Sequence, residues 1–129
     1  MMIDINKLSS RIIGAAMEVH KTLGPGLLES AYEECICHEL SLGGFSLERQ
    51  KPLSVQHKGI NLDCGYRLDV VVENAIILEL KSFENSEPIH KAQLLTYLKL
   101  SDLKLGLLLN FNVTLMREGI VRMVNELEE

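Results

Sequence analysis

The chain has 129 residues, of which 47% are hydrophobic and 24% charged, and its net charge is −5. This length is enough to bury a hydrophobic core, so we expect one domain over residues 1–129. The acidic balance excludes a surface that is basic throughout, as sequence-independent phosphate binding would favour, although it allows a local basic face.

The sequence indicates neither a membrane segment nor a disulfide. No apolar run approaches the roughly 18 residues of a membrane span, and Ile12 to Met17 is too short for a signal peptide. Cys35 and Cys37 lie two apart on an expected helix and point about 200° apart, which suits neither a zinc knuckle nor a disulfide. We therefore expect a cytoplasmic protein without membrane contact, in which these two cysteines and Cys64 are buried or half-buried thiols.

Two helices are expected first. Asp4 suits an N-cap, and apolar residues then recur at helical spacing until Gly24-Pro25-Gly26, which must break the helix. A second helix is expected from about Leu27 to Leu42, because its apolar residues form one stripe and two glycines follow it.

The hydrophobic period changes to two at residue 45, which predicts strands. Residues 45–57 read as a strand interrupted near Pro52, and Lys58-Gly59 suits a hairpin turn that leads into a strand at residues 60–72. Another strand is expected at residues 75–82.

The C-terminal part returns to a helix and then to strands. Pro88 fits the first position of a helix that runs to about Leu100. Residues 104–112 read as a buried strand, and residues 113–116 and 120–124 read as a closing hairpin. The order ααβββαβ(ββ), without a repeat or a linker, indicates an α/β (α+β) protein.

The hairpin at residues 67–82 carries charges among its apolar residues. The apolar positions are even-numbered on both strands, so even positions must oppose one another across the pair. A three-residue loop around Asn74 satisfies this register, whereas a two-residue loop would mix the faces. With the odd loop, Asp69, Glu79 and Lys81 share the other face, and the two acids come within about 5 to 7 Å.

Two carboxylates this close repel each other unless a cation or a shared proton lies between them. Hard divalent cations such as Mg²⁺ or Mn²⁺ prefer such oxygen ligands, and a bound cation lowers the pKa of its water. Lys81 would then orient or help deprotonate the attacking water. The alternative is that these charges are a solvated strand end.

These residues resemble a known signature. Asp69 followed by Glu79-Leu80-Lys81 resembles the catalytic motif of the PD-(D/E)XK nuclease superfamily, with Leu68 in place of the motif's proline. The segment GLLESAY, which contains Gly26, Glu29 and Tyr32, resembles the motif that names the GxxExxY branch. Residues 19–40, 90–100 and 106–112 are similar to that branch as well. The resemblance implies a restriction-endonuclease-like core, a mixed β-sheet flanked by helices.

The resemblance also assigns supporting residues. Glu29 corresponds to the helix acid that completes the metal shell, although an acid in the first turn of a helix is also stabilised by the helix dipole alone. Gln93 and Tyr97 resemble the QxxxY pair of recombination-type nucleases. They share a helix face, so they line the site or form a polar stripe beside the core.

Some neighbouring residues have less specific interpretations. His20 lies in the resembling stretch, but near a helix C-terminus it can simply interact with the last carbonyls. Tyr32 and Met17 have the spacing of core residues. Arg67, Lys91 and Lys99 flank the expected site, as local positive charge or as scattered solvated bases.

Two functions follow from these observations. The first is a metal-dependent nuclease that cuts DNA by water attack, with Mg²⁺ or Mn²⁺ held by Glu29, Asp69 and Glu79. Lys81 would be catalytic, and Gln93 and Tyr97 would support it. The second is a catalytically inactive nuclease-fold module that acts through a protein or nucleic-acid partner. The chain leaves little room for DNA recognition, so we also expect a protein partner or self-association.

Overall fold

The computed structural model describes residues 3–85 and 87–126, which form three α-helices, seven strands and one 3₁₀ helix. The helices are α1 (Ile5–Leu23), α2 (Glu29–Leu42) and α3 (Pro88–Ser101), and the 3₁₀ helix is η1 (Met116–Gly119). The strands are β1 (Leu47–Pro52), β2 (Val55–His57), β3 (Ile60–Leu62), β4 (Arg67–Val72), β5 (Ile76–Lys81), β6 (Leu105–Asn110) and β7 (Ile120–Val124).

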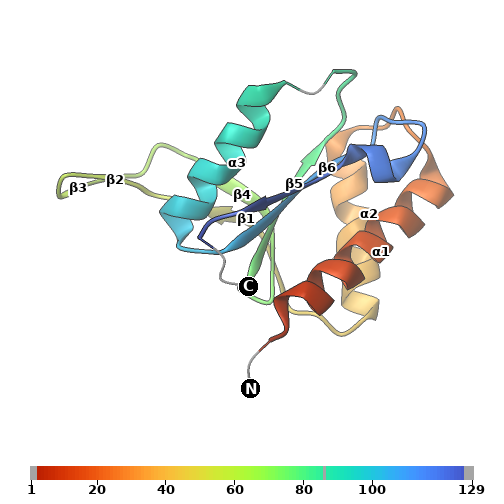
Figure 1. The fold of residues 1–129 in the computed structure, drawn as a ribbon, viewed down its shortest axis with the longest axis horizontal. Coiled ribbons are helices and arrows are strands. Elements are labelled where there is room, and N and C mark those ends of the chain that lie inside the picture. Colours follow the sequence, from red (N-terminus) through yellow and green to blue (C-terminus); the bar gives the residue numbers. More distant parts are fainter. Residues whose placement is uncertain (1–2, 86, 127–129) are drawn as a thin grey trace.

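A five-stranded mixed sheet forms the centre of the fold. Its strand order is β1-β4-β5-β6-β7, with β5 and β6 parallel and the other neighbours antiparallel. Helices α1 and α2 lie on one face and α3 lies on the other (Figure 1). The parallel pair arises because α3 carries the chain from the end of β5 back to the start of β6. This arrangement confirms the predicted α/β class with a mixed sheet flanked by helices.

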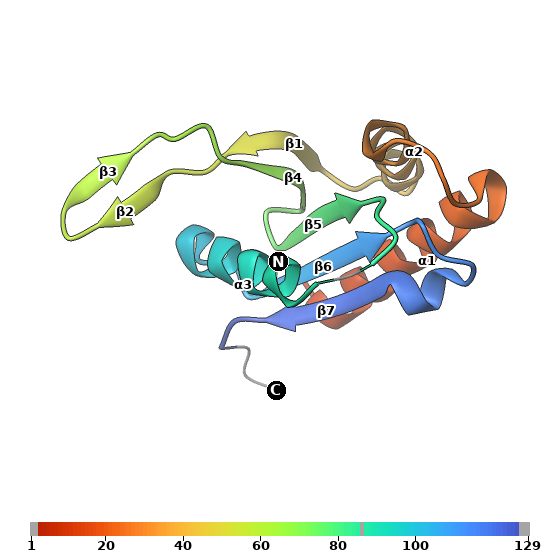
Figure 2. The same cartoon turned by 90° about the horizontal axis from the view of Figure 1, so that it is seen from above.

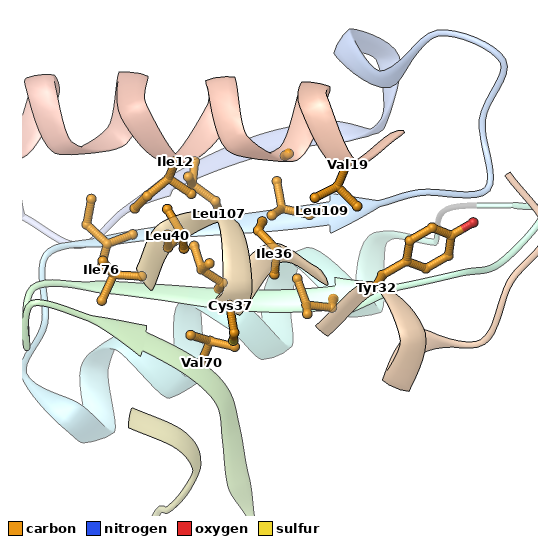
Figure 3. Close-up of a cluster of buried hydrophobic side chains, with 14 of the residues drawn as sticks. Ile12, Val19, Tyr32, Ile36, Cys37, Leu40, Val70, Ile76, Leu107 and Leu109 are labelled. Atoms are coloured by element: carbon orange, nitrogen blue, oxygen red, sulfur yellow. The ribbon is translucent and has the colours of Figure 1, made fainter. Parts of the chain in front are cut away.

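The larger hydrophobic core lies between the sheet and the α1–α2 pair (Figure 3). Ile12 from α1 and Ile36 from α2 are fully buried there, against strand residues such as Leu107. The Asp4 side chain caps α1 by accepting hydrogen bonds from the amides of Asn6 and Lys7, as expected. These contacts fix the two helices on one face of the sheet.

A smaller core lies between the sheet and α3. Leu94 and Leu98 of α3 pack there with Ile77 and Leu108 from the strands. Because both sheet faces are covered, every residue of β6 is buried.

The short strands β2 and β3 form a separate two-stranded hairpin that projects from the sheet (Figure 2). His57 pairs with Ile60, and the two turn residues Lys58 and Gly59 have φ of 47° and 86°, as the expected two-residue hairpin turn requires. The hairpin leaves the sheet where β1 ends and returns where β4 begins. The expected strands at residues 45–57 and 60–72 are therefore each divided in two.

The predicted odd loop between β4 and β5 is confirmed. Val72 pairs with Ile76 and Val70 with Leu78, so three residues connect the strands. Glu73 and Asn74 have φ of 54° and 50°, the left-handed backbone that this loop needs.

Four expectations are wrong. Leu68 packs on the α3 side of the sheet rather than with Val70, because the regular alternation of β4 breaks at the intervening residue. Residues 113–116 form no strand, since the chain turns through η1 and only β7 pairs with β6. Met17 is 41% exposed on the outer side of α1, and Cys64 is exposed in the projecting segment.

Within the described residues, no helix combines the length and the apolar character needed to cross a membrane.

Candidate active site

Two acids meet where β4 and β5 separate. The Glu79 carboxylate accepts a hydrogen bond from the Asp69 amide, with an N to Oε2 distance of 3.0 Å. The Asp69 carboxylate accepts one from the Leu80 amide, with an N to Oδ2 distance of 2.8 Å. The predicted proximity of Asp69 and Glu79 therefore follows from the three-residue loop and these two contacts.

The backbone pairing of β4 is irregular on both sides near Asp69. The β4–β5 ladder ends at Val70 and Leu78, so the next amides take side-chain acceptors instead of carbonyls. On the other side, Gln50 of β1 has φ of 51°, which interrupts regular pairing opposite Asp69. A non-glycine residue in this backbone region is uncommon and marks a local constraint.

Burial raises the pKa of both carboxyls, and the Asp69 charge raises the pKa of Glu79 further. Burial raises the pKa of Asp69 above its ordinary value, while the Leu80 hydrogen bond and the Lys81 charge lower it. Burial, followed by the Asp69 charge, raises the pKa of Glu79 to about 7, and Glu79 is only 5% exposed. Near neutral pH the pair therefore holds a proton or gains from a cation.

Lys81 and Tyr97 both act on this pair. Lys81 is half-buried at the end of β5, and its charge lowers the pKa of both carboxyls. Tyr97 of α3 is 8% exposed, and burial, followed by the Glu79 charge, raises the pKa of its hydroxyl. Its ring lies 6.4 Å from that of Tyr66 at the base of the projecting hairpin. The structure thus brings α3 and the hairpin base to the acids.

Glu29 is exposed as the first residue of α2. Its charge adds to the raised pKa of both Asp69 and Glu79, so it belongs to the same electrostatic environment. Within residues 3–85 and 87–126, no three His, Cys, Asp or Glu side chains gather closely enough to hold a metal ion. Glu29 is therefore a neighbour of the pair rather than part of a formed three-acid cluster.

Gln93 is exposed on α3, four residues before Tyr97, and its side chain makes no hydrogen bond with the described residues. Arg67, Lys91 and Lys99 are exposed as well. Of the expected QxxxY pair, Tyr97 is therefore buried and Gln93 is exposed to solvent.

The donor set suits a hard divalent cation. Each of Asp69 and Glu79 uses one carboxylate oxygen for an amide hydrogen bond, and the other oxygen accepts none from the described residues. Carboxylate oxygens are the ligands that Mg²⁺ and Mn²⁺ prefer, and a cation would offset both causes of the raised pKa of Glu79, which are its burial and the Asp69 charge.

A charged network that the sequence analysis missed holds α2 against β1. Arg49 contacts Glu33 and Glu34, each with a 2.8 Å N to O distance. The Gln50 amide donates to Glu33 at 2.6 Å. The hydrogen bonds with Glu34 and Glu33 raise the pKa of Arg49. The sequence did not indicate this contact, because the two acids on α2 and the Arg-Gln pair on β1 are far apart along the chain.

Tyr32 packs, as expected, and also makes polar contacts. Its ring stacks on Phe111 with 4.4 Å between centroids. Its hydroxyl donates to the Gly24 carbonyl at 2.6 Å and accepts from the Leu27 amide at 3.1 Å. His20 does not bond the carbonyls of its own helix, because its Nε2 lies 2.7 Å from the Val113 carbonyl oxygen.

The comparisons with known proteins agree with this arrangement. A model of the PD-(D/E)XK nuclease superfamily matches residues 6–123, which include every candidate site residue from Glu29 to Tyr97. No curated protein and no solved structure matches the chain. The mixed sheet with three flanking helices is the restriction-endonuclease-like arrangement of that superfamily. The chain therefore belongs to the PD-(D/E)XK nuclease superfamily.

Proposed function

We propose that this protein is a metal-dependent nuclease that hydrolyses phosphodiester bonds in DNA. The observation that carries the proposal is the buried Asp69–Glu79 pair beside Lys81, in which burial, followed by the Asp69 charge, raises the pKa of Glu79 to about 7. A strand end that needed only acceptors for its two amides would be served by neutral side chains, without the repulsion between two buried acids.

Asp69 and Glu79 would hold Mg²⁺ or Mn²⁺, and Glu29 would complete the shell, directly or through water. When bound, the cation neutralises phosphate charge and lowers the pKa of a water ligand. Lys81 orients or helps to deprotonate the attacking water, or its ammonium stabilises the developing negative charge. Gln93 and Tyr97 support a phosphate or Lys81 from α3.

The same proposal assigns the chain to the GxxExxY branch and treats residues 1–129 as one nuclease-like domain. Gly26, Glu29 and Tyr32 carry the branch motif. The Tyr32 contacts with the loop before α2 support this assignment, because they give the motif tyrosine a role beside the motif acid.

Nucleic acid as the partner follows from the superfamily, and the charge around the site supports it. The projecting β2–β3 hairpin contains no acidic residue from Val55 to Leu62, and Lys58 lies in the turn at its tip. Arg67 is exposed at the start of β4, two residues before Asp69. This local surface differs from the chain as a whole, whose net charge is −5. Self-association or a protein partner would enlarge the surface that is available to bind nucleic acid.

The decisive experiment incubates the pure protein with labelled single-stranded, duplex and branched DNA in Mn²⁺, in Mg²⁺ and in chelator. Cleavage that requires the metal and disappears in both Asp69→Asn and Lys81→Ala supports the proposal. Cleavage that persists in both variants would identify a contaminating nuclease.

A second candidate is a catalytically inactive module of the same fold. The exposed position of Glu29 outside a formed three-acid cluster favours it. Metal-independent DNA binding by the wild type, without cleavage of any of the three substrates, would support this candidate over the nuclease.

A further inference from the structure

The loop between α1 and α2 is held by two hydroxyls, one from α2 itself and one from the residue that follows β5. The Tyr32 hydroxyl joins both ends of this loop, donating to the Gly24 carbonyl and accepting from the Leu27 amide. The Ser82 hydroxyl donates to the Leu27 carbonyl at 2.7 Å. Leu27 is therefore bonded on both sides of its backbone, two residues before Glu29.

These contacts close a ring that includes the end of β5. The Lys81 carbonyl accepts a hydrogen bond from the Phe111 amide at 3.0 Å. The Phe111 ring stacks on Tyr32, with an interplanar angle of 7°. Ser82 follows Lys81 directly and returns to Leu27. The loop before Glu29 and the strand that carries Glu79 and Lys81 are thus tied together at two points.

The α2 N-terminus has no side-chain cap. Leu28 occupies the N-cap position and cannot accept the first amides of the helix with its side chain. Gly26, which precedes the helix, has φ of 94°. Its backbone therefore has the left-handed conformation of a tight turn and does not continue the helix. The orientation of the first turn of α2 therefore depends on the loop contacts.

We infer that the hydroxyls of Tyr32 and Ser82 are positioning groups that set Glu29 against the Asp69–Glu79 pair. The inference rests on the proposed function, and it names what the motif tyrosine does in it. Tyr32 is too deeply buried to touch a substrate, since its exposed fraction is 0%. It acts through the loop and Glu29, whereas Glu29 itself would hold the metal, directly or through water.

The first measurement follows amide hydrogen exchange in Tyr32→Phe, which keeps the ring and its stacking. Exchange at the Leu27 amide should accelerate at least about tenfold, because that amide loses its acceptor. The Gly43 amide is an internal control, since it donates to the Glu39 and Leu40 carbonyls at the other end of α2. Ile36→Val is the matched control variant, because it loses a methyl group from the same buried side of α2 and leaves the hydroxyl contacts intact.

The second measurement is the Mn²⁺ dissociation constant, taken in a cycle with Glu29→Gln. If Tyr32 acts through Glu29, Tyr32→Phe should weaken Mn²⁺ binding roughly tenfold in the wild-type background and not at all in the Glu29→Gln background. Ser82→Ala should behave like Tyr32→Phe. Ser101→Ala should leave the constant unchanged, because it removes a comparable serine-to-carbonyl bond at the far end of α3.

Three results overturn the inference while the proposed function survives. They are unchanged exchange at Leu27 in Tyr32→Phe, an equal loss of Mn²⁺ affinity in both backgrounds, and an equal loss in Ile36→Val. Failure of the wild type to bind Mn²⁺ overturns the proposed function, and the positioning role with it. A Tyr32→Phe effect that depends on Glu29 supports both.

Discussion

Asp69 and Glu79 each hydrogen-bond the backbone of the opposite strand. The Glu79 carboxylate accepts from the Asp69 amide at 3.0 Å, and the Asp69 carboxylate accepts from the Leu80 amide at 2.8 Å. The two acids thereby replace the ladder bonds that are lost where β4 and β5 separate. Each acid has a structural task as well as its proposed chemical one, because an unpaired buried amide is costly. Amide variants, which keep an acceptor oxygen, therefore separate chemistry from folding better than alanine variants do.

The first prediction is that the metal-free protein loses stability as pH rises through the acidic range. Glu79 has an ordinary pKa of 4.5 and a folded pKa of about 7. Between these values the folded protein binds more protons than the unfolded chain, so the free energy of unfolding falls as pH rises. The total loss by about pH 8 is on the order of 3 kcal/mol. Melting temperatures in chelator at a series of pH values measure it.

Glu79→Gln is the control for this pH dependence. Glutamine keeps an oxygen for the Asp69 amide and cannot ionise, so the variant should melt above the wild type near pH 8 and show a flatter profile. A variant with the same slope as the wild type would assign the pH dependence to other groups.

The sequence was sufficient to predict the register that brings the acids together. Apolar parity required an odd loop, and the pairing of Val72 with Ile76 confirms it. Local patterns also predicted the Asp4 cap and the Lys58-Gly59 turn. Each of these features depends on residues close together in the chain, where spacing carries the information.

Long-range contacts were not predictable in the same way. The break in alternation between Leu68 and Val70 occurs beside Gln50 on another strand, where a positive φ interrupts pairing. The Tyr32 hydroxyl contacts a loop whose shape depends on glycine conformation. Residues 113–116 carried an apolar pattern that suits a strand, but the turn through η1 leaves them without a strand partner. The roles of Glu29, Gln93 and Tyr97 stay predictions.

The second prediction concerns Lys81. Lys81→Ala should reduce cleavage by at least about 100-fold, because the water loses the group that orients or deprotonates it. Metal binding should change little when it is measured above the pKa of Glu79, which the Lys81 charge helps to lower. Lys7→Ala is the matched control, since it removes the same charge from the exposed first turn of α1. Cleavage at the wild-type rate by Lys81→Ala would contradict the proposed mechanism.

The third prediction contrasts two glycines. A Cβ at Gly119 would overlap the Asn110 carbonyl oxygen, which is backbone and cannot move aside easily. Gly119→Ala should therefore destabilise the protein by about 1–3 kcal/mol. Gly14 lies inside α1, and a Cβ added there would meet nothing within 4 Å, so Gly14→Ala should stabilise the protein by about 0.5–1 kcal/mol. Chemical denaturation measures both, and opposite signs are the expected result.

The fourth prediction uses metal binding without a substrate. A cation that binds only the folded protein stabilises it by about 2.7 kcal/mol at a hundredfold excess over Kd, which is several degrees in melting temperature for this size. Mn²⁺ and Mg²⁺ should raise the melting temperature of the wild type. Asp69→Asn should lose most of that rise, because one of the two carboxylates is gone.

The comparison in chelator makes this prediction specific to the acid pair. Asp69→Asn removes a charge that raises the pKa of Glu79, and asparagine keeps an oxygen for the Leu80 amide, so the variant should melt no lower than the wild type. Ca²⁺ should stabilise the wild type without supporting cleavage, because it takes the same oxygens with a looser geometry. If Mn²⁺ raised the melting temperatures of wild type and Asp69→Asn equally, the cation would bind elsewhere. The acids would then be a structural strand end, and the inactive module would become the better account of the protein.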